Sequence, residues 1–162
     1  MKKKFLHKIL ISASLIVFLA LLSKAVSADT TMFRLYNPNS GEHFYTALAY
    51  ERDSLKRDGW RDEGTGWIAP DTGKNVYRLY NPNSGDHHYT MKKFERDALV
   101  GLGWRYEGVG WKSGGKVALY RQYNPNTKTG THNYTASKFE RDHLIDIGWR
   151  DEKVGWYAVS TK

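Results

Sequence analysis

Apolar and polar positions follow the same order three times along this chain, at intervals of about 44 residues. In the second copy, the alternation of aromatic, apolar and polar residues from Tyr77 to Tyr80 predicts a short strand. The Asn-Pro-Asn-Ser-Gly segment at 81–85 has the residue types of a turn. His87-His88-Tyr89 then returns as the partner strand, so each copy is expected to open with a hairpin.

A helix is expected after the hairpin. In the second copy it runs from Met91 to about Leu102, with Thr90 as its N-cap and Gly103 in a left-handed conformation after its end. Five apolar residues would give this helix one buried stripe: Met91, Phe94, Ala98, Leu99 and Leu102. Two short extended pieces follow, at 104–107 and 110–111, which predicts a β-β-α-β unit with a short fourth strand.

The three copies, at residues 33–67, 77–111 and 120–156, predict one α+β, β-rich domain over residues 29–162. Units of this length bury their apolar faces against neighbouring units. Three units in an open array would leave two uncapped ends, so closure around a pseudo-threefold axis is favoured. The expected architecture is three-bladed and propeller-like, or trefoil-like.

The first 28 residues have the pattern of a secretion signal. Four lysines between positions 2 and 8 precede an apolar stretch from Ile9 to Leu22, and Val26-Ser27-Ala28 supplies small residues for cleavage. The apolar stretch is shorter than the roughly 20 residues that a membrane-spanning helix needs. We therefore expect cleavage after Ala28, secretion, and no membrane association of the mature chain.

Removal of this leader changes the charge. The full chain has 25 basic and 17 acidic residues, but five of the lysines lie in the leader, which leaves a net charge of +3. So small a charge gives little support to nucleic-acid binding. The chain has no cysteine, so packing must stabilise it without disulfides, and its six Trp and eleven Tyr predict an aromatic core.

The repeated string Tyr-Asn-Pro-Asn-Ser-Gly-x-His-x-Tyr-Thr, followed by an aromatic residue, Glu-Arg-Asp and two Gly-Trp pairs, resembles a repeat family of uncharacterised function. That family occurs in secreted proteins of Gram-positive bacteria and in some fungal proteins, sometimes appended to peptidoglycan-cleaving enzymes. The resemblance covers residues 33–157 and implies an extracellular module associated with cell walls or glycans. The third copy departs from the pattern, because its hairpin loop is two residues longer, from Thr127 to Thr131.

One histidine per copy, His43, His87 and His132, shares a strand face with a tyrosine two residues later. Three interpretations remain open. Each histidine could fix its hairpin through a carboxylate or a backbone carbonyl. Histidine and tyrosine could frame a sugar ring. The three histidines could also meet on the axis as a zinc site, although they lie about 45 residues apart, whereas zinc ligands usually have short spacings.

The Glu-Arg-Asp runs at 51–53, 95–97 and 140–142 could suggest acid–base catalysis. Adjacent helical residues point about 100° apart, so the two carboxylates do not converge on one substrate. Ion pairs between units are the expected role. The partners would be the arginines of the first strands or those after the helices: Arg34, Arg78 and Arg121, or Arg61, Arg105 and Arg150.

The six tryptophans form two sets. Trp60, Trp104 and Trp149 follow the helices and are expected to pack beneath them. Trp67, Trp111 and Trp156 lie in Gly-flanked strands near a unit edge, where an indole could be core or could stack on a sugar.

These observations favour a secreted, non-catalytic binding module at the bacterial cell surface, with no cofactor and no metal. Its expected partner is a cell-wall glycan or another polysaccharide. The alternatives are a secreted protein–protein interaction factor, such as an inhibitor, adhesin or bacteriocin-like effector, or less favourably a cell-wall hydrolase. The candidate ligand-binding residues are equivalent positions of the three copies: Tyr36, Asn37, His43, Tyr45 and Trp67; Tyr80, Asn81, His87, Tyr89 and Trp111; Tyr123, Asn124, His132, Tyr134 and Trp156.

Overall fold

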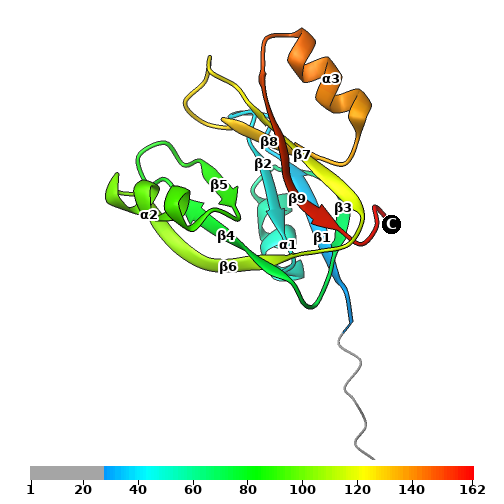
Figure 1. The fold of residues 1–162 in the computed structure, drawn as a ribbon. Helices are drawn as coiled ribbons and strands as arrows, with labels where there is room; N and C mark the ends of the chain where they lie inside the picture. The colour runs from blue at the N-terminus through cyan, green and yellow to red at the C-terminus, as the bar shows by residue number, and fades with distance from the viewer. Residues whose placement is uncertain (1–27) are drawn as a thin grey trace, which may run out of the picture.

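The computed structural model describes residues 28–162, so the expected leader, except for its last residue, lies outside the described residues. Twelve elements alternate as strand, strand, helix and strand in three successive units (Figure 1). The first unit contains β1 (Thr30–Tyr36), β2 (His43–Thr46), α1 (Ala49–Arg57) and β3 (Arg61–Ala69). The second contains β4 (Lys74–Tyr80), β5 (His87–Thr90), α2 (Lys93–Gly101) and β6 (Arg105–Ser113). The third contains β7 (Val117–Tyr123), β8 (His132–Thr135), α3 (Lys138–Asp146) and β9 (Arg150–Ala158).

Each unit folds its strands into one small antiparallel sheet, with the first strand in the middle: β2-β1-β3, β5-β4-β6 and β8-β7-β9. The predicted hairpin is confirmed, with Tyr80 opposite His87 and Tyr77 opposite Thr90. The expected fourth strand is wrong, because residues 105–113 form one continuous strand with a register shift opposite Tyr77. The chain has positive φ near this shift, at Gly64, Gly108 and, in the third unit, Lys153.

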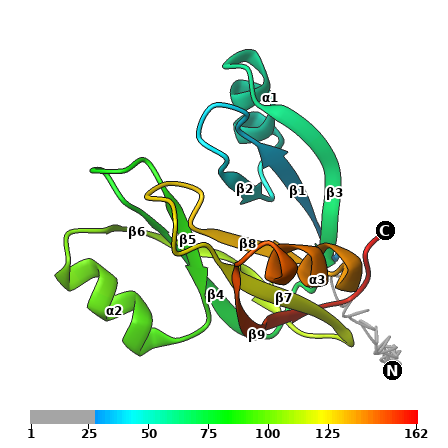
Figure 2. The same cartoon turned by 90° about the horizontal axis from the view of Figure 1, so that it is seen from above.

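The helices differ most from the expectation. α2 begins at Lys93, because the Thr90 hydroxyl accepts a hydrogen bond from the Lys92 amide and leaves residues 91 and 92 outside the helix. Gly103 has the expected positive φ, at 92°. The buried stripe is wrong, since no residue of α2 is buried and Phe94 and Leu102 are 86% and 75% exposed. The helices lie on the outside of the molecule (Figure 2), and none in the described range is long and apolar enough to span a bilayer.

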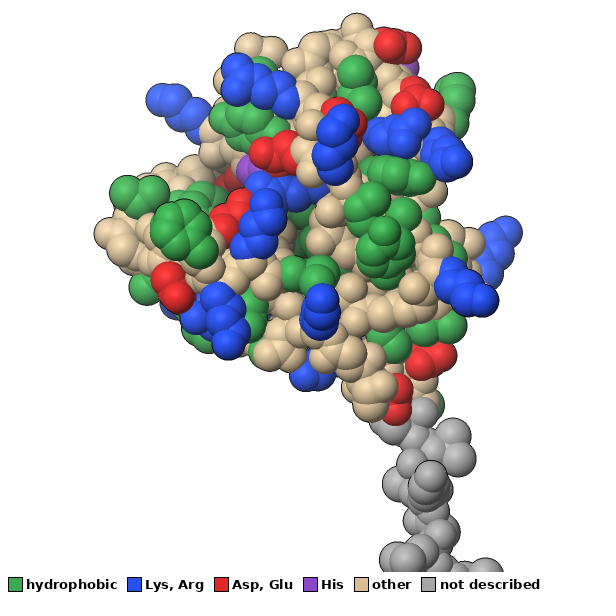
Figure 3. Space-filling view, viewed as in Figure 1, with side chains coloured by type: hydrophobic (Ala, Val, Ile, Leu, Met, Phe, Trp, Pro, Cys, Tyr) green, Lys and Arg blue, Asp and Glu red, His purple; other side chains and the backbone are tan. Residues whose placement is uncertain are grey.

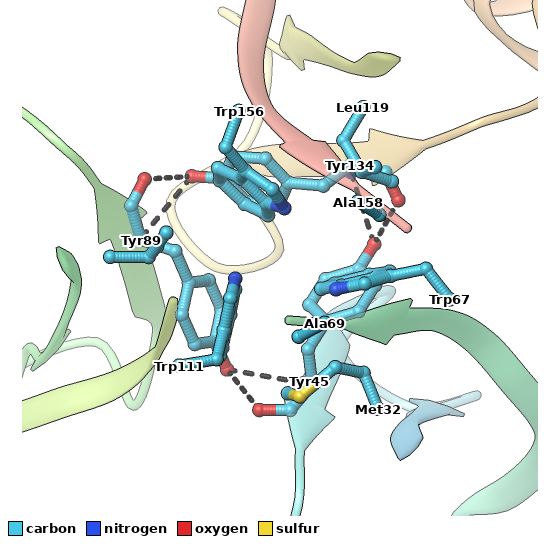
Figure 4. Packing of buried hydrophobic residues seen from close by; sticks show 11 residues of the cluster. Met32, Tyr45, Trp67, Ala69, Tyr89, Trp111, Leu119, Tyr134, Trp156 and Ala158 are labelled. Carbon is cyan, nitrogen blue, oxygen red and sulfur yellow. Dashed lines mark hydrogen bonds between the residues drawn. The ribbon is translucent and has the colours of Figure 1, made fainter. Parts of the chain in front are cut away.

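The centre of the molecule is an aromatic cluster to which every unit contributes (Figure 4). Trp67, Trp111 and Trp156 contact one another, with ring centroids 5.3–5.7 Å apart and tilted or edge-to-face planes. A tyrosine packs against each of these indoles at 4.6–5.2 Å, in the pairs Tyr45–Trp67, Tyr89–Trp111 and Tyr134–Trp156. The expectation of an aromatic core is therefore confirmed.

Three tyrosine hydroxyls link the units in a cyclic order. The Tyr45 hydroxyl donates to the carbonyl of Tyr134 and accepts from its amide, both at 3.0 Å. Tyr134 makes the same two bonds to the backbone of Tyr89, and Tyr89 makes them to Tyr45, at 2.9–3.2 Å. Each unit therefore satisfies backbone groups of another unit in the buried centre.

Three similar β-β-α-β units in a β-rich chain are confirmed. A propeller-like or trefoil-like closure is not confirmed, because each three-stranded sheet is separate and none of them closes. The units meet through side chains instead.

Candidate functional site

Ion pairs connect each unit to the next. Glu51 of α1 accepts two hydrogen bonds, both of 2.9 Å, from the guanidinium of Arg78 in β4. The other two junctions repeat this bidentate contact at 2.5–3.0 Å, between Glu95 and Arg121 and between Glu140 and Arg34. The expected ion pairs between units are thus confirmed for the glutamates of the Glu-Arg-Asp runs, with the first-strand arginines as partners.

A second carboxylate lies on the Nε side of each guanidinium. Glu152 Oε2 is 2.5 Å from Arg121 Nε and 3.2 Å from His132 Nε2. Burial alone would raise the carboxyl pKa, but the hydrogen bond from His132 and the charge of Arg121 outweigh it and hold the pKa of Glu152 at about 2. Equivalent contacts of 2.7 Å and 3.0 Å join Arg34 to Glu63 and Arg78 to Glu107. Each junction therefore presents one guanidinium between two carboxylates.

A pocket opens beside each of these charged groups. The pockets have volumes of about 200 Å³ between the first and second units, 230 Å³ between the second and third, and 340 Å³ between the third and first. Thr46, Leu48, Arg78, Glu107 and Val109 contribute to the first of them. Charged groups on one wall and apolar side chains on another suit a ligand that carries hydroxyl groups on an apolar frame.

An exposed aromatic ring stands next to each pocket. Tyr50, Phe94 and Phe139 occupy the second position of the three helices, directly before the glutamate of the ion pair. Their side chains are 78%, 86% and 84% exposed. The residues that line each pocket end one or two positions before the helix begins, so chain connectivity places the ring at the pocket rim. Hydrophobic and charged side chains alternate over this surface (Figure 3).

Sequence reasoning missed these three aromatic residues, because it assigned Phe94 to the buried face of a helix. A signal was present: all three copies keep an aromatic ring at this position. A repeated exposed ring has no packing role, so its repetition points to contact with something outside the chain.

The structure places six of the predicted site residues in the core. Tyr45, Tyr89 and Tyr134 are at most 1% exposed, and Trp67, Trp111 and Trp156 are at most 5% exposed. They contribute at most to the floors of the junction pockets. The two tryptophan sets have exchanged their expected places, because Trp60, Trp104 and Trp149 after the helices remain partly exposed. The physical reason is that both sides of the sheets are covered near the centre, while the helices cover little.

The remaining predicted site residues hold the hairpins together. The Asn37 side chain accepts the amide hydrogen of Asn39 at 2.9 Å, which closes the turn, and Asn81 and Asn124 do the same. Tyr36 lies between Arg61 and His43, with ring contacts of 5.9 Å and 5.0 Å. Tyr80 and Tyr123 are enclosed in the same way.

The three repeat histidines lie next to carboxylates, as the first of the three interpretations expects. His87 Nδ1 is 2.7 Å from Glu42 of the first unit, and the Nε2 atoms of His43 and His132 lie 3.5 Å and 3.2 Å from Glu63 and Glu152. Within residues 28–162, no group of three or more His, Cys, Asp or Glu side chains is arranged to hold a metal ion.

His88 gives the stability of the fold a dependence on pH. It is 3% exposed, and burial lowers its pKa to about 4, against the opposing hydrogen bond to Glu95. The unfolded chain, with a histidine pKa near 6.5, binds the proton more readily, so this stability is complete above pH 6.5 and is lost as the pH falls towards 4. Between pH 7 and pH 5 we expect wild type to lose about 2 kcal/mol more unfolding free energy than His88→Phe.

Urea denaturation at both pH values measures this difference. Phenylalanine fits the position because Phe44 occupies its equivalent in the first unit. Identical pH dependence in the two proteins would show that His88 does not titrate as its burial requires.

The fold and the junction pockets accompany one match to a known family. A family model described as Domain of unknown function (DUF5648) matches residues 31–159. No curated protein and no solved structure matches the chain.

Proposed function

We propose that this chain, which belongs to the family described as Domain of unknown function (DUF5648), is a secreted, non-catalytic module that binds polysaccharide through three equivalent sites. The observation that carries the proposal is the exposed ring in every unit, Tyr50, Phe94 and Phe139, each beside a pocket with fixed charged groups. Pyranose rings have an apolar face that stacks on an aromatic side chain and hydroxyl groups around the rim.

The charged groups of each junction support recognition of hydroxyl groups. Glu63 and Glu152 keep 36% and 34% of their side chains exposed although they pair with arginine. A carboxylate has about four lone-pair sites, so one that contacts arginine can still accept from a sugar hydroxyl. Because the two carboxylates and the arginine already fix one another, the ligand need not order them.

The cyclic order of the contacts supports a further part of the proposal, that the three units close around a pseudo-threefold axis without a continuous sheet. The tyrosine hydroxyls and the Arg–Glu pairs each return to the first unit after the third. Such an arrangement spaces three similar sites around one molecule, which favours a repeating polymer over a single small molecule.

The N-terminal lysines and apolar stretch support export, and the resemblance to repeats in wall-associated proteins favours a cell-wall glycan as the polymer. The binding test compares the mature protein with Tyr50→Ala, Phe94→Ala and Phe139→Ala, singly and combined, on purified peptidoglycan sacculi and a glycan array. Each single change should weaken apparent affinity several-fold, and the triple change by about 100-fold or more, since multivalent binding is lost with its sites.

Leu102→Ala is the matched control, because Leu102 is 75% exposed on the other end of α2 but its equivalents are Asp58 and Ile147. It should bind like wild type. Wild-type binding by the triple variant, or binding to a surface protein with none to any glycan, would overturn the proposal and favour a protein–protein interaction factor. Cleavage of sacculi by the purified chain would instead favour a hydrolase.

A further inference from the structure

The junction between the third and first units departs from the other two at its inner layer. In the first unit, the ring of Phe44 lies between Trp60, at 6.2 Å, and His87 of the second unit, at 4.7 Å. In the second unit, the ring of His88 lies between Trp104, at 6.1 Å, and His132 of the third unit, at 4.5 Å. Both junctions are therefore filled by a ring that bridges one unit to the next.

The third unit has Asn133 at this position, and asparagine carries no ring. Its amide turns to Gln122, at 3.3 Å, and to Glu140, at 3.2 Å. The space between Trp149 and His43 is consequently not bridged by a side chain from β8. A pocket of about 280 Å³ lies here, with walls that include Tyr36, His43, Leu144, Ile147 and Trp149. We call it the third-to-first pocket.

A second departure leaves a polar group without its partner. At the first-to-second junction, Glu42 Oε1 accepts from His87 Nδ1 at 2.7 Å. The third unit has Thr131 where the others have Glu42 and Asp86, and the Thr131 hydroxyl donates to Asp86 at 2.5 Å. His43 Nδ1 is buried and has no hydrogen-bond partner among residues 28–162.

The tautomer of His43 makes this nitrogen a donor. Arg34 Nη2 lies 2.9 Å from His43 Nε2, and a guanidinium can only donate, so Nε2 accepts and the ring proton lies on Nδ1. A buried donor without an acceptor is costly, about 1–3 kcal/mol. The Gln122 Nε2 group is buried and without a partner as well.

The charge around this pocket differs from the other junctions in the same direction. Replacement of an acid by Thr131 removes one negative charge, and the longer loop of the third unit adds the exposed Lys128. The pocket therefore lacks a ring, an acceptor and a negative charge that its counterparts supply from the chain itself.

We propose that the third-to-first pocket binds a sugar ring that carries a carboxylate. The ring takes the place between Trp149 and His43 that Phe44 and His88 fill elsewhere, and the carboxylate accepts from His43 Nδ1 as Glu42 does from His87. The pocket lies near the lower end of the size range of ligand pockets, roughly 300–1,000 Å³, so it holds one residue of a chain. The inference rests on the proposed function in taking polysaccharide as the source of the sugar, and its site is distinct from the three aromatic rings.

The test follows the histidine ring signals by NMR while glucuronic acid, or glucose as the neutral counterpart, is added to the mature protein. Glucuronate should shift the His43 signals saturably, with a dissociation constant at least about tenfold lower than that of glucose, since a hydrogen bond to a charged group contributes about 1.5–3 kcal/mol. Equal affinity for the two sugars, or no saturable shift with glucuronate, would overturn the proposal.

Two pairs of variants locate the site. Asn133→Phe restores the bridging ring and Thr131→Glu restores the acceptor, so each should weaken glucuronate binding about tenfold or more. Ile147→Asp places a negative charge on an exposed residue of the rim, which cannot disturb the core, and should weaken glucuronate but not glucose. Ile147→Asn and Leu102→Asp are its controls for shape and for charge elsewhere, and both should bind like wild type. Unchanged binding by Ile147→Asp and Asn133→Phe together would place the ligand elsewhere.

The triple variant of Tyr50, Phe94 and Phe139 separates this inference from the proposed function. It should lose binding to sacculi and keep wild-type affinity for glucuronate. Loss of glucuronate binding in the folded triple variant would show that the acid binds at the aromatic rings and would overturn the pocket. Retention of sacculus binding would instead count against the proposed function alone.

Discussion

Tyr45→Phe is expected to lower the free energy of unfolding by about 2–5 kcal/mol, because it leaves two buried backbone groups unpaired. The Tyr45 hydroxyl both accepts from the amide of Tyr134 and donates to its carbonyl, at 3.0 Å. Tyr45 is fully buried, so water does not replace the lost oxygen without a rearrangement of the core. The ring itself remains, so the change isolates the hydroxyl from the packing of the cluster.

Tyr50→Phe is the matched control. It removes a hydroxyl from a side chain that is 78% exposed, and its effect should stay within about 0.5 kcal/mol. Chemical denaturation of both variants measures the difference. If Tyr45→Phe proves as stable as Tyr50→Phe, the cyclic tyrosine bonds do not hold the units together.

Removal of the third unit should abolish folding altogether. A chain that ends at residue 116 loses Leu119, Tyr134, Trp156 and Ala158 from the central cluster. It also loses Glu140, the partner of Arg34, and Tyr134, whose hydroxyl pairs the backbone of Tyr89. Because the helices bury no residue, the two remaining units have no alternative core of their own.

Circular dichroism of residues 28–116 should show no cooperative thermal transition. A circular permutant that begins at Gly115 and joins Lys162 to Ala28 by a short linker is the control, since it keeps all three units. The linker is short because the first and last described segments both pair beside Ile68, through Thr31 and Ser160. A monomeric two-unit chain with a cooperative transition would show that the units fold independently.

The hairpins and the glutamate–arginine pairs could be predicted from sequence because their causes are local or repeated. Asn-Pro-Asn at 81–83 specifies a turn whatever surrounds it, and the structure places Asn81 as the residue that closes it. The pairing of Glu95 with Arg121 needed only the assumption that units pack on one another. Similarly, the high aromatic content indicated an aromatic core before any contact was known.

The positions of individual rings could not be predicted in this way. Periodicity placed Phe94 on the buried face of a helix, yet the helix lies outside the sheets and buries none of its residues. Trp111 had equal claims to the core and to a ligand, and the choice depended on the other two indoles that meet it from residues about 44 positions away on either side. Burial of a side chain is a property of its neighbours in space, which a repeat pattern does not specify.

The sequence by itself determined three β-β-α-β units, their turns and the chemistry that links them, because short-range propensities and an internal repeat carry that information. Only the tertiary structure decided which aromatic rings face solvent and which junction is incomplete. Asn133 and Thr131 are unremarkable as single departures from a repeat. They come together with His43 at one junction because unit packing brings residues about 90 positions apart into contact, and the physical consequence is a pocket with an unpaired donor.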